Sequence, residues 1–357
     1  MQFRWLMPAL CFFATAQAHH GPGQFDSSLP VEVTGVVTDI RLVNPHGYVY
    51  FDVTEDDGSI TPWRCELQAG SLHRRAGWTD DLFPIGGEIT VTGDRGSREE
   101  TACALRTVIL ADGRTLNRYD QISDIVDAPT GAADRLAADG TLDLNGSWAA
   151  PQRNPGGGAR PGGGMGPGGM GPGGMGGGGL PVDLTAAGLA AVEGLSHEVD
   201  NPRFSCMPVN IFFDWEFDRH VNEIVQTDAT ITLRYGFMDI ERTVYLDMDE
   251  HPADIEPSRA GHSIGRWEDG DLVVDTVGFA DGFIVAGPGG VAKHSDQLHA
   301  VERFSYDAAT QGLTRTYWAE DPLYFNGRYT GEDTVFVSNV PFEPYSCLEL
   351  KDDYIEN

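Results

Sequence analysis

The chain has 357 residues, with 54 acidic residues against 24 lysines and arginines and a formal net charge of −30. This length exceeds the roughly 100 to 200 residues of most compact domains, so we expect two domains. A surface this acidic repels phosphate backbones and no run of basic residues offsets it, which argues against nucleic acid as a partner and favours cations.

The first 18 residues have the pattern of a secretory signal peptide. Arg4 provides a basic start, residues 5–14 are apolar, and Ala16-Gln17-Ala18 is a small-x-small cleavage sequence. The apolar run is shorter than the roughly 20 residues that span a bilayer, and no later segment approaches that length. Lipid attachment at Cys11 is disfavoured because Leu10 stands where a small residue is required. We therefore predict cleavage after Ala18 and a periplasmic or secreted protein without a membrane span.

Cleavage would leave four cysteines, which suggests two disulfides in an oxidising compartment. They are Cys65, Cys103, Cys206 and Cys347. Four cysteines allow three pairings, and the domain division given below favours Cys65 with Cys103 and Cys206 with Cys347, because each pair then lies within one domain. No Cys-x-x-Cys sequence occurs, which excludes a zinc ribbon or a thioredoxin-type site.

Residues 19–118 are predicted to form a small β-barrel. Strands are expected at residues 31–42, 48–54, 60–67, 88–93 and 104–110, where apolar and polar residues alternate or turn pairs such as Asp57-Gly58 separate the runs. Residues 69–78 have helical character. Five strands and one helix in about 90 residues are typical of an oligonucleotide-fold barrel, although the charge argues against the usual ligand of that fold.

Residues 119–142 are polar and form a predicted linker, and residues 143–357 form the second predicted domain. Within it, residues 156–179 are rich in glycine and repeat Gly-Pro-Gly-Gly-Met in tandem, so we expect this loop to be disordered. A short helix is expected at residues 184–192. Strands are expected at residues 222–227, 230–235, 242–246, 264–267, 272–277, 298–304, 313–318 and 334–337.

The strands of the second domain are joined by tight-turn pairs such as Asp269-Gly270 and Gln311-Gly312. An antiparallel meander of about eight strands must either close or pack on a second sheet to protect its edges. We predict closure into a lipocalin-like antiparallel barrel, which the Gly146-x-Trp148 sequence at its start also suggests. The predicted fold class is therefore all-β, with two barrels of different size.

Cleavage after Ala18 would make His19 the first residue of the exported chain and His20 the second. The α-amine and imidazole of a terminal histidine form a chelate, and a histidine in second position can bind together with that amine and the amide nitrogen between them. Both arrangements suit Cu(II), which prefers nitrogen donors in a tetragonal plane. The α-amine has a reference pKa of about 7.7 to 8, so a metal can displace its proton at neutral pH.

His46 is the best candidate for a further copper ligand, because the sequence Asn44-Pro45-His46-Gly47 predicts a turn between two strands that presents the imidazole. The alternative is that His19 and His20 form a solvated tail and that His46 only caps a turn. Met165, Met170 and Met175 recur every five residues in the glycine-rich loop, and their thioethers suit Cu(I). The alternative for these methionines is a sequence repeat without a role.

A second group of chemically active residues lies in the second domain: His251, His262, His294, His299, Glu302 and Arg303. On a strand, His299 and Arg303 share one face while Glu302 lies on the other, so whichever face points inward carries a charge. We take these residues as candidates for a polar network in the barrel, or for a second metal or catalytic site. The alternative is a set of hydrogen-bonded structural histidines, and no pair has the spacing of a zinc-protease helix.

The sequence Gly261-His262-Ser263-Ile264-Gly265 matches the Gly-x-Ser-x-Gly pattern of serine hydrolases. That motif requires a strand before it and a helix after it, whereas a strand-like segment follows here. We interpret it as the entry into a barrel strand.

The first domain resembles a family of secreted bacterial proteins of unknown function. The resemblance covers roughly residues 19–116, and its motifs are specific. They are His19-His20, Gly35-Val36-Val37, Asn44-Pro45-His46, Trp63-Arg64-Cys65-Glu66, Arg75-Ala76-Gly77-Trp78 and Ala111-Asp112-Gly113-Arg114. This chain has Val43 where the family has an aromatic residue, and Gly21-Pro22 where it has Ser-Phe. The resemblance implies that a His-His start is usual in the family, but it implies no activity.

The second domain is similar to another uncharacterised family of secreted β proteins. The shared motifs are His251-Pro252, Pro257-Ser258, Gly261 to Glu268, Asp275 to Phe279, His294-Ser295, Leu298-His299, Glu302-Arg303-Phe304 and Asp321-Pro322. This resemblance also implies no activity.

The leading hypothesis is an exported protein that binds copper through His19, with His20 and His46, for acquisition, buffering or delivery of the metal. One alternative is a lipocalin-like module that binds a small apolar ligand without metal. Another is a structural or assembly protein of the cell exterior. The sequence indicates no reaction and no substrate, so an enzyme is the less favoured class.

Overall fold

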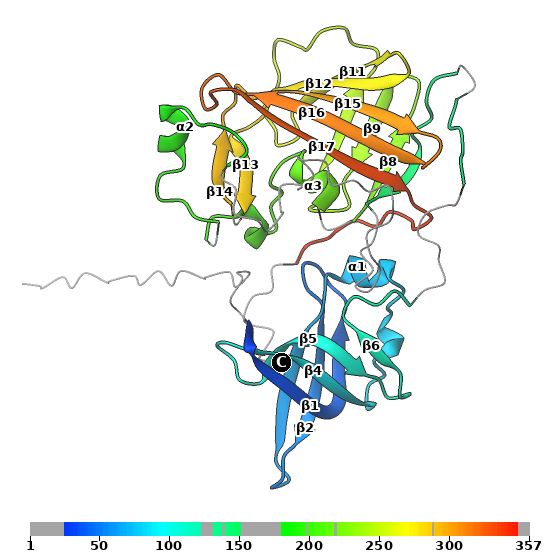
Figure 1. The fold of residues 1–357 in the computed structure, drawn as a ribbon, viewed down its shortest axis with the longest axis vertical. Helices are drawn as coiled ribbons and strands as arrows, with labels where there is room; N and C mark the ends of the chain where they lie inside the picture. Colours follow the sequence, from blue (N-terminus) through cyan, green and yellow to red (C-terminus); the bar gives the residue numbers. More distant parts are fainter. Residues whose placement is uncertain are drawn as a thin grey trace, which may run out of the picture.

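The computed structural model describes residues 25–122, 131–137, 140–150, 180–197, 199–217, 220–287 and 289–348. The chain folds into a small β domain and a larger one, which lie one below the other in Figure 1. The prediction of an all-β protein is confirmed. The predicted signal peptide, His19 and His20, and the loop that contains Met165, Met170 and Met175 lie outside the described residues.

The small domain contains six strands and one short α-helix. They are β1 (Phe25–Arg41), β2 (Tyr48–Thr54), β3 (Ile60–Glu66), α1 (Gly70–Arg75), β4 (Glu88–Gly96), β5 (Ala102–Ile109) and β6 (Thr115–Asn117). The sheet order is β3-β2-β1-β4-β5-β6, and β3 also pairs in parallel with β5, which closes β1 to β5 into a barrel. This connectivity, with a helix between β3 and β4, is that of the oligonucleotide fold.

Alternating residues build the core of this small barrel. In β4, Ile89 and Val91 are buried while Thr90 and Thr92 are less so, as expected for a strand with one inward face. Trp78 and Phe83, which follow α1, pack into the same apolar cluster. The Cys65–Cys103 disulfide joins β3 to β5 at their parallel pairing, and this predicted bond is confirmed.

The larger domain contains eleven strands in the part of the chain that the structure describes. They are β7 (Gly146–Ala149), β8 (Val221–Gln226), β9 (Thr230–Arg234), β10 (Glu241–Tyr245), β11 (His262–Glu268), β12 (Asp271–Val277), β13 (Gly282–Gly287), β14 (Gly290–His294), β15 (His299–Asp307), β16 (Gly312–Glu320) and β17 (Arg328–Val337). Its α-helices are α2 (Ala186–Ala191) and α3 (Phe213–Glu216).

Nine of these strands form a closed barrel, as predicted, and β13 and β14 form a separate hairpin. Closure comes from the pairing of β17 with β7. The barrel departs from a simple antiparallel meander because β10 and β11 run parallel. Residues 246–261 connect these two strands, and parallel neighbours require a connection of about a dozen residues or more.

The interior of the larger barrel is filled by side chains of the strands and by residues 211–216, here called the inserted segment. The segment that includes α3 places Phe212 and Trp215 in the main apolar cluster, together with Phe304 from β15 and Leu272 from β12. Trp215 contacts Phe304 edge-on, with ring centroids 6.3 Å apart. A lipocalin-like ligand would need the space that these rings occupy.

A chain of buried ion pairs crosses the same interior. Glu302 accepts hydrogen bonds from Arg242 (2.6 Å) and Arg315 (3.1 Å), and Arg315 also pairs with Asp333. Arg315 and Glu302 are fully buried. Arg315 further donates to the backbone oxygens of Ile211 and Phe212, both at 2.8 Å, so it attaches the inserted segment to the barrel wall.

Part of the predicted linker lies against the larger barrel. The backbone N–H of Ala133 donates to Ala308 O (2.9 Å), and the hydroxyl of Tyr306 donates to Ala133 O (2.8 Å). Arg135 donates to the backbone oxygen of Asp143 (2.9 Å). Residues 131–137 and 140–142, here called the strap, therefore cross one end of the barrel.

Glu302→Ala should destabilise the protein by about 3–5 kcal/mol, because it leaves Arg242 and Arg315 buried without their shared carboxylate. Urea unfolding followed by near-ultraviolet circular dichroism measures this change. Arg234→Ala is the control: Arg234 pairs with Glu223 and Glu241 on the exposed face, so little change is expected. Equal effects of the two substitutions would contradict the role assigned to the buried pairs.

Candidate functional site

The loop between β1 and β2 lies where the two domains meet, and Asn44 is buried there. Its Oδ1 accepts hydrogen bonds from the backbone N–H (3.1 Å) and hydroxyl (3.0 Å) of Ser71, just inside α1. Its Nδ2 donates to the backbone oxygen of Tyr345, and its own backbone oxygen accepts the N–H of Leu348 (2.8 Å). Asn44 thus binds both domains at once, which fixes the loop that carries His46.

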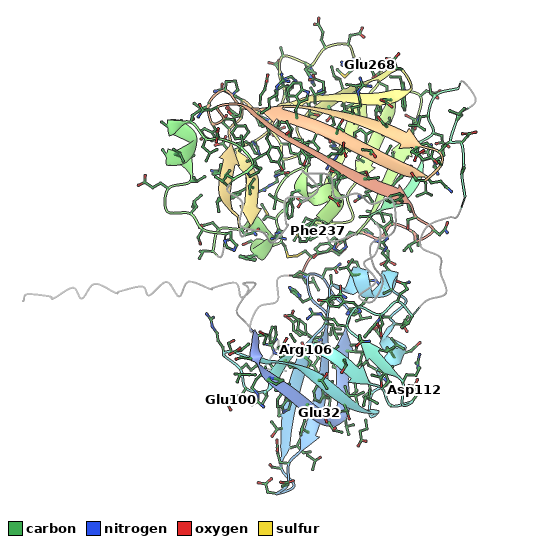
Figure 2. The ribbon with its side chains drawn as sticks, viewed as in Figure 1. Glu32, Glu100, Arg106, Asp112, Phe237 and Glu268 are labelled. Carbon is green, nitrogen blue, oxygen red and sulfur yellow. A yellow bond between two sulfur atoms is a disulfide. The ribbon has the colours of Figure 1, made fainter. Side chains whose placement is uncertain are left out.

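Further polar contacts cross the same interface. The hydroxyl of Ser71 lies 3.1 Å from Nδ1 of His220, and Arg74 donates to Glu343 (2.8 Å). His220 packs against Phe237, which Figure 2 shows on the side of the larger barrel that faces the small domain. Burial, assisted by the nearby Arg75, lowers the pKa of His220 to about 3. The imidazole is therefore neutral in the interface at ordinary pH.

The Cys206–Cys347 disulfide holds the C-terminal segment that contacts Asn44. This predicted bond is confirmed, and it joins residues 141 positions apart. Asp239 also holds the segment, because its carboxylate accepts the backbone N–H groups of Tyr345 (2.6 Å) and Ser346 (2.8 Å). The larger domain therefore presents a fixed backbone to the small one.

His46 pairs with a buried carboxylate. Its Nδ1 lies 3.2 Å from Oε1 of Glu66, and its side chain is 36% exposed while that of Glu66 is 9% exposed. Burial alone would raise the pKa of Glu66, but His46 and Arg118 outweigh it and lower that pKa overall. Glu66 is therefore ionised. A carboxylate behind an imidazole is the usual outer partner of a metal-ligating histidine, since it fixes the tautomer and the ring orientation.

The start of α1 packs closely against the backbone of the β1–β2 loop. Gly70 donates to Val43 O (2.8 Å), and a Cβ on Gly70 would lie 2.1 Å from Leu42 O, so only glycine fits at the start of α1. His73, in the same helix, accepts the backbone N–H of Gln68 at its Nε2 (3.0 Å). Burial lowers the pKa of His73 to about 3, with a smaller contribution from Arg118. His73 is a structural residue.

Three of the predicted histidines meet on the outer face of the larger barrel. Nδ1 of His262 lies 2.8 Å from Nδ1 of His251, and Nε2 of His251 lies 3.0 Å from Oδ1 of Asp275. Oδ2 of Asp275 lies 3.0 Å from Nε2 of His299, whose Nδ1 is 3.8 Å from Glu320. We call these five residues the histidine relay. Its contacts at 2.8–3.0 Å run from His262 on β11 to His299 on β15, and Glu320 on β16 lies at ion-pair distance from His299.

The relay members differ in the direction of their pKa shifts. The hydrogen bond to Asp275 raises the pKa of His299, whereas burial and the neighbouring His251 lower the pKa of His262. Burial acts to raise the pKa of Asp275, but hydrogen bonds from His299 and His251 outweigh it and lower that pKa. The relay therefore holds a charged pair at one end and a neutral imidazole at the other.

The structure separates the other predicted residues from this relay. Glu302 belongs to the buried ion pairs, and Arg303 faces outward, where it donates to Asp271 (2.9 Å) and Glu268 (2.6 Å). His294 is buried, with its Nδ1 3.0 Å from the backbone oxygen of Ser295. The six residues proposed as one network thus divide into four groups: the three relay histidines, Glu302, Arg303 and His294.

Asp275 and Glu320 are the relay residues that the sequence analysis did not identify as candidates, and Asp275 is the one that joins two histidines. The tight Asp269-Gly270 turn pairs Ile264 with Asp275 and His262 with Val277. This hairpin register places Asp275 diagonally across from His262 on the same face, because side chains alternate along each strand. The register of the β11–β12 hairpin was the sequence signal that could have identified Asp275.

Ser263 does not have the setting of a hydrolase nucleophile. It is buried within β11, and its hydroxyl lies 2.9 Å from the hydroxyl of Thr276 on β12. The interpretation of Gly261–Gly265 as the entry into a strand is confirmed.

The described residues contain neither a preformed metal cluster nor a candidate membrane helix. No group of three or more His, Cys, Asp or Glu side chains is already arranged around one metal position. Nor does this part of the chain contain a helix with the length and apolar character needed to cross a membrane.

Asp275→Asn should lower the pKa of His299 towards its ordinary value, because it removes the carboxylate that stabilises the imidazolium. Nuclear magnetic resonance titration of the His299 ring protons measures this pKa. The loss of folding stability in the variant should be greatest between about pH 4 and 6.5, where both partners are charged.

This stability difference should shrink outside that window. It falls as the pH rises through the raised pKa of folded His299, because the imidazole then loses its proton. It also falls as the pH drops through the lowered pKa of folded Asp275. A His299 pKa unchanged by the substitution would contradict the ion pair.

Comparison with known proteins identifies one family match. Residues 9–104 match the model of a family described as a family of unknown function (DUF6152). No curated protein matches the chain, and no solved structure matches it. The chain therefore contains an uncharacterised domain in its N-terminal part.

Proposed function

We propose that this is an exported copper-binding protein, in which His19, as the first residue after cleavage following Ala18, binds Cu(II) together with His20 and His46. Acquisition, buffering or delivery of copper in the periplasm or outside the cell would be its role. The observation that carries the proposal is the pairing of His46 with the buried Glu66 on a loop fixed by both domains.

The fixed loop supports the proposal because a specific metal site needs at least one donor whose position does not depend on the metal. Asn44 holds the loop from both domains, and Glu66 lies against Nδ1 of His46. A histidine whose Nδ1 faces a carboxylate typically binds a metal through Nε2. The α-amine and imidazole of His19 would supply the remaining nitrogen donors that Cu(II) prefers.

Chain length allows His19 to approach Glu66, the partner of His46. The strand ladder connects Phe25 to Gly96, Arg95 to Cys103 and Cys103 to Cys65, which is adjacent to Glu66. Three strand spacings of about 4.8 Å and two residues of about 3.4 Å give a path of roughly 21 Å along the barrel surface. Six residues of extended chain span at most about 20 to 22 Å, and the straight-line distance across a curved surface is shorter than the path.

The repeated methionines would give the same protein a lower-affinity site for Cu(I), because thioethers are soft ligands. The apolar-ligand alternative is less well supported, since Phe212, Trp215 and Arg315 occupy the interior that such a ligand would need. No observation on the described residues favours a purely structural role.

His46→Ala in the exported protein should weaken Cu(II) binding, because it removes the donor held by the fold. Glu66→Gln should weaken binding about 10- to 100-fold while leaving the imidazole in place, as expected for an outer-shell partner. Isothermal titration calorimetry in competition with a nitrogen chelator of known affinity measures both, after intact mass has established the first residue. His197→Ala is the matched control for loss of a histidine outside the site.

An N-terminal extension of two residues tests the chelate itself, since it moves the α-amine away from His19 without altering any residue that the structure describes. Binding should weaken in this form as well. Equal affinity in the extended, His46→Ala and unmodified proteins would refute the proposed site.

A further inference from the structure

A cavity of about 530 Å³ opens at one end of the larger barrel, beneath the strap. Its walls come from the strap, from the β11–β12 turn and from the β15–β16 turn. Figure 2 shows Glu268, which precedes that first turn, at the end of the barrel away from the small domain. The cavity is therefore independent of His46 and of the interface between the domains. Its volume lies within the range of small-molecule sites, about 300–1,000 Å³.

Aromatic and aliphatic side chains form part of the wall. Trp267 from the end of β11 and Tyr306 from the end of β15 are half-buried, and Leu142 of the strap is buried. Tyr306 is held in place by its hydrogen bond to Ala133 O (2.8 Å) and by an edge contact with Trp148. Two aromatic rings at the barrel mouth, of which Tyr306 is held by these contacts, provide surfaces for a flat or apolar ligand body.

The charged residues of the wall are mainly acidic. They include Asp134, Asp269 and Asp271, of which Asp271 pairs with Arg303 at 2.9 Å. Asp134 and Asp269 are exposed to solvent. Arg135 is the basic residue of the wall; it donates to the backbone oxygens of Asp143 and Asn145 and lies over the ring of Trp148. The cavity therefore carries an excess of negative charge beside aromatic faces.

We propose that this cavity is a binding site for an organic cation, such as a quaternary ammonium compound with an aromatic body. A cation over an aromatic face is attracted by the ring quadrupole, and more strongly where it is desolvated. The carboxylates of Asp134 and Asp269 add a long-range attraction that a neutral ligand does not gain and that repels an anion. The site would operate whether or not the protein binds copper.

Isothermal titration calorimetry on the exported protein, with a chelator present to remove metals, tests this site. The probes are phenyltrimethylammonium, the neutral N,N-dimethylaniline and the anionic benzenesulfonate, which share one ring and differ in charge. The cation should bind at least about tenfold more tightly than the neutral probe, and benzenesulfonate should bind least.

Variants locate the binding. Trp267→Leu should weaken phenyltrimethylammonium binding about tenfold through loss of the aromatic face. Asp134→Asn with Asp269→Asn should reduce the preference for the cation over the neutral probe, because only the attraction of the aromatic rings remains. Asp269 has a positive φ of 53°, which asparagine tolerates, so the double variant should fold. Asp57→Asn, in the turn between β2 and β3, is the control for loss of an exposed aspartate.

Three results would overturn the proposal. The first two are no binding of the cation, and equal binding of the cation and benzenesulfonate. The third is cation binding that is unchanged in Trp267→Leu, provided that this variant keeps the circular dichroism spectrum of the parent. Because metals are absent from this experiment, its failure would leave the copper proposal unaffected. Copper binding without cation binding would support the copper proposal and contradict the proposed cation site.

Discussion

The contacts of Asn44 determine how the two barrels act together. A single buried amide accepts from Ser71 in the small domain and donates to Tyr345 in the larger one, while its backbone oxygen receives the N–H of Leu348. Leaving such a group unpaired in a buried interface costs about 1–3 kcal/mol, so both domains favour one loop conformation. The position of His46, two residues later, follows from that constraint.

The larger domain contributes to this constraint through its own internal order. Arg315 binds Glu302 and Asp333 and also the backbone oxygens of the inserted segment, so the barrel interior is an ionic and aromatic core. The same domain fixes the C-terminal segment through the Cys206–Cys347 bond and Asp239. The buried ion pairs and the anchored C-terminal segment thus stabilise the surface against which the small barrel docks.

Much of the fold could be predicted from periodicity and turn residues. The expected strand at residues 272–277 differs from β12 by one residue, and both disulfides follow from the domain division. The hairpin of β13 and β14 was missed because Gly282–Gly287 shows no polar alternation: its later residues are all buried by tertiary packing. The start of β1 was missed because residues 26–28 are polar and a bulge interrupts the pairing with β4 there.

The candidate site was less predictable than the fold. A turn at Asn44-Pro45-His46 could be foreseen, but the partner Glu66 lies 20 residues away, and Tyr345 lies in the other domain. Likewise, His251, His262 and His299 were identified by residue type, while the carboxylate that joins two of them depends on strand register. Long-range pairing of this kind is not recorded in local sequence patterns, because it is set by which strands become neighbours.

The most direct test of the central claim is a crystal structure of the exported protein with bound copper. We predict one Cu(II) ion within about 2.0 to 2.1 Å of the α-amine of His19 and of an imidazole nitrogen of His46, with Glu66 still against Nδ1. A copper ion bound elsewhere, with His46 outside its coordination sphere, would contradict it.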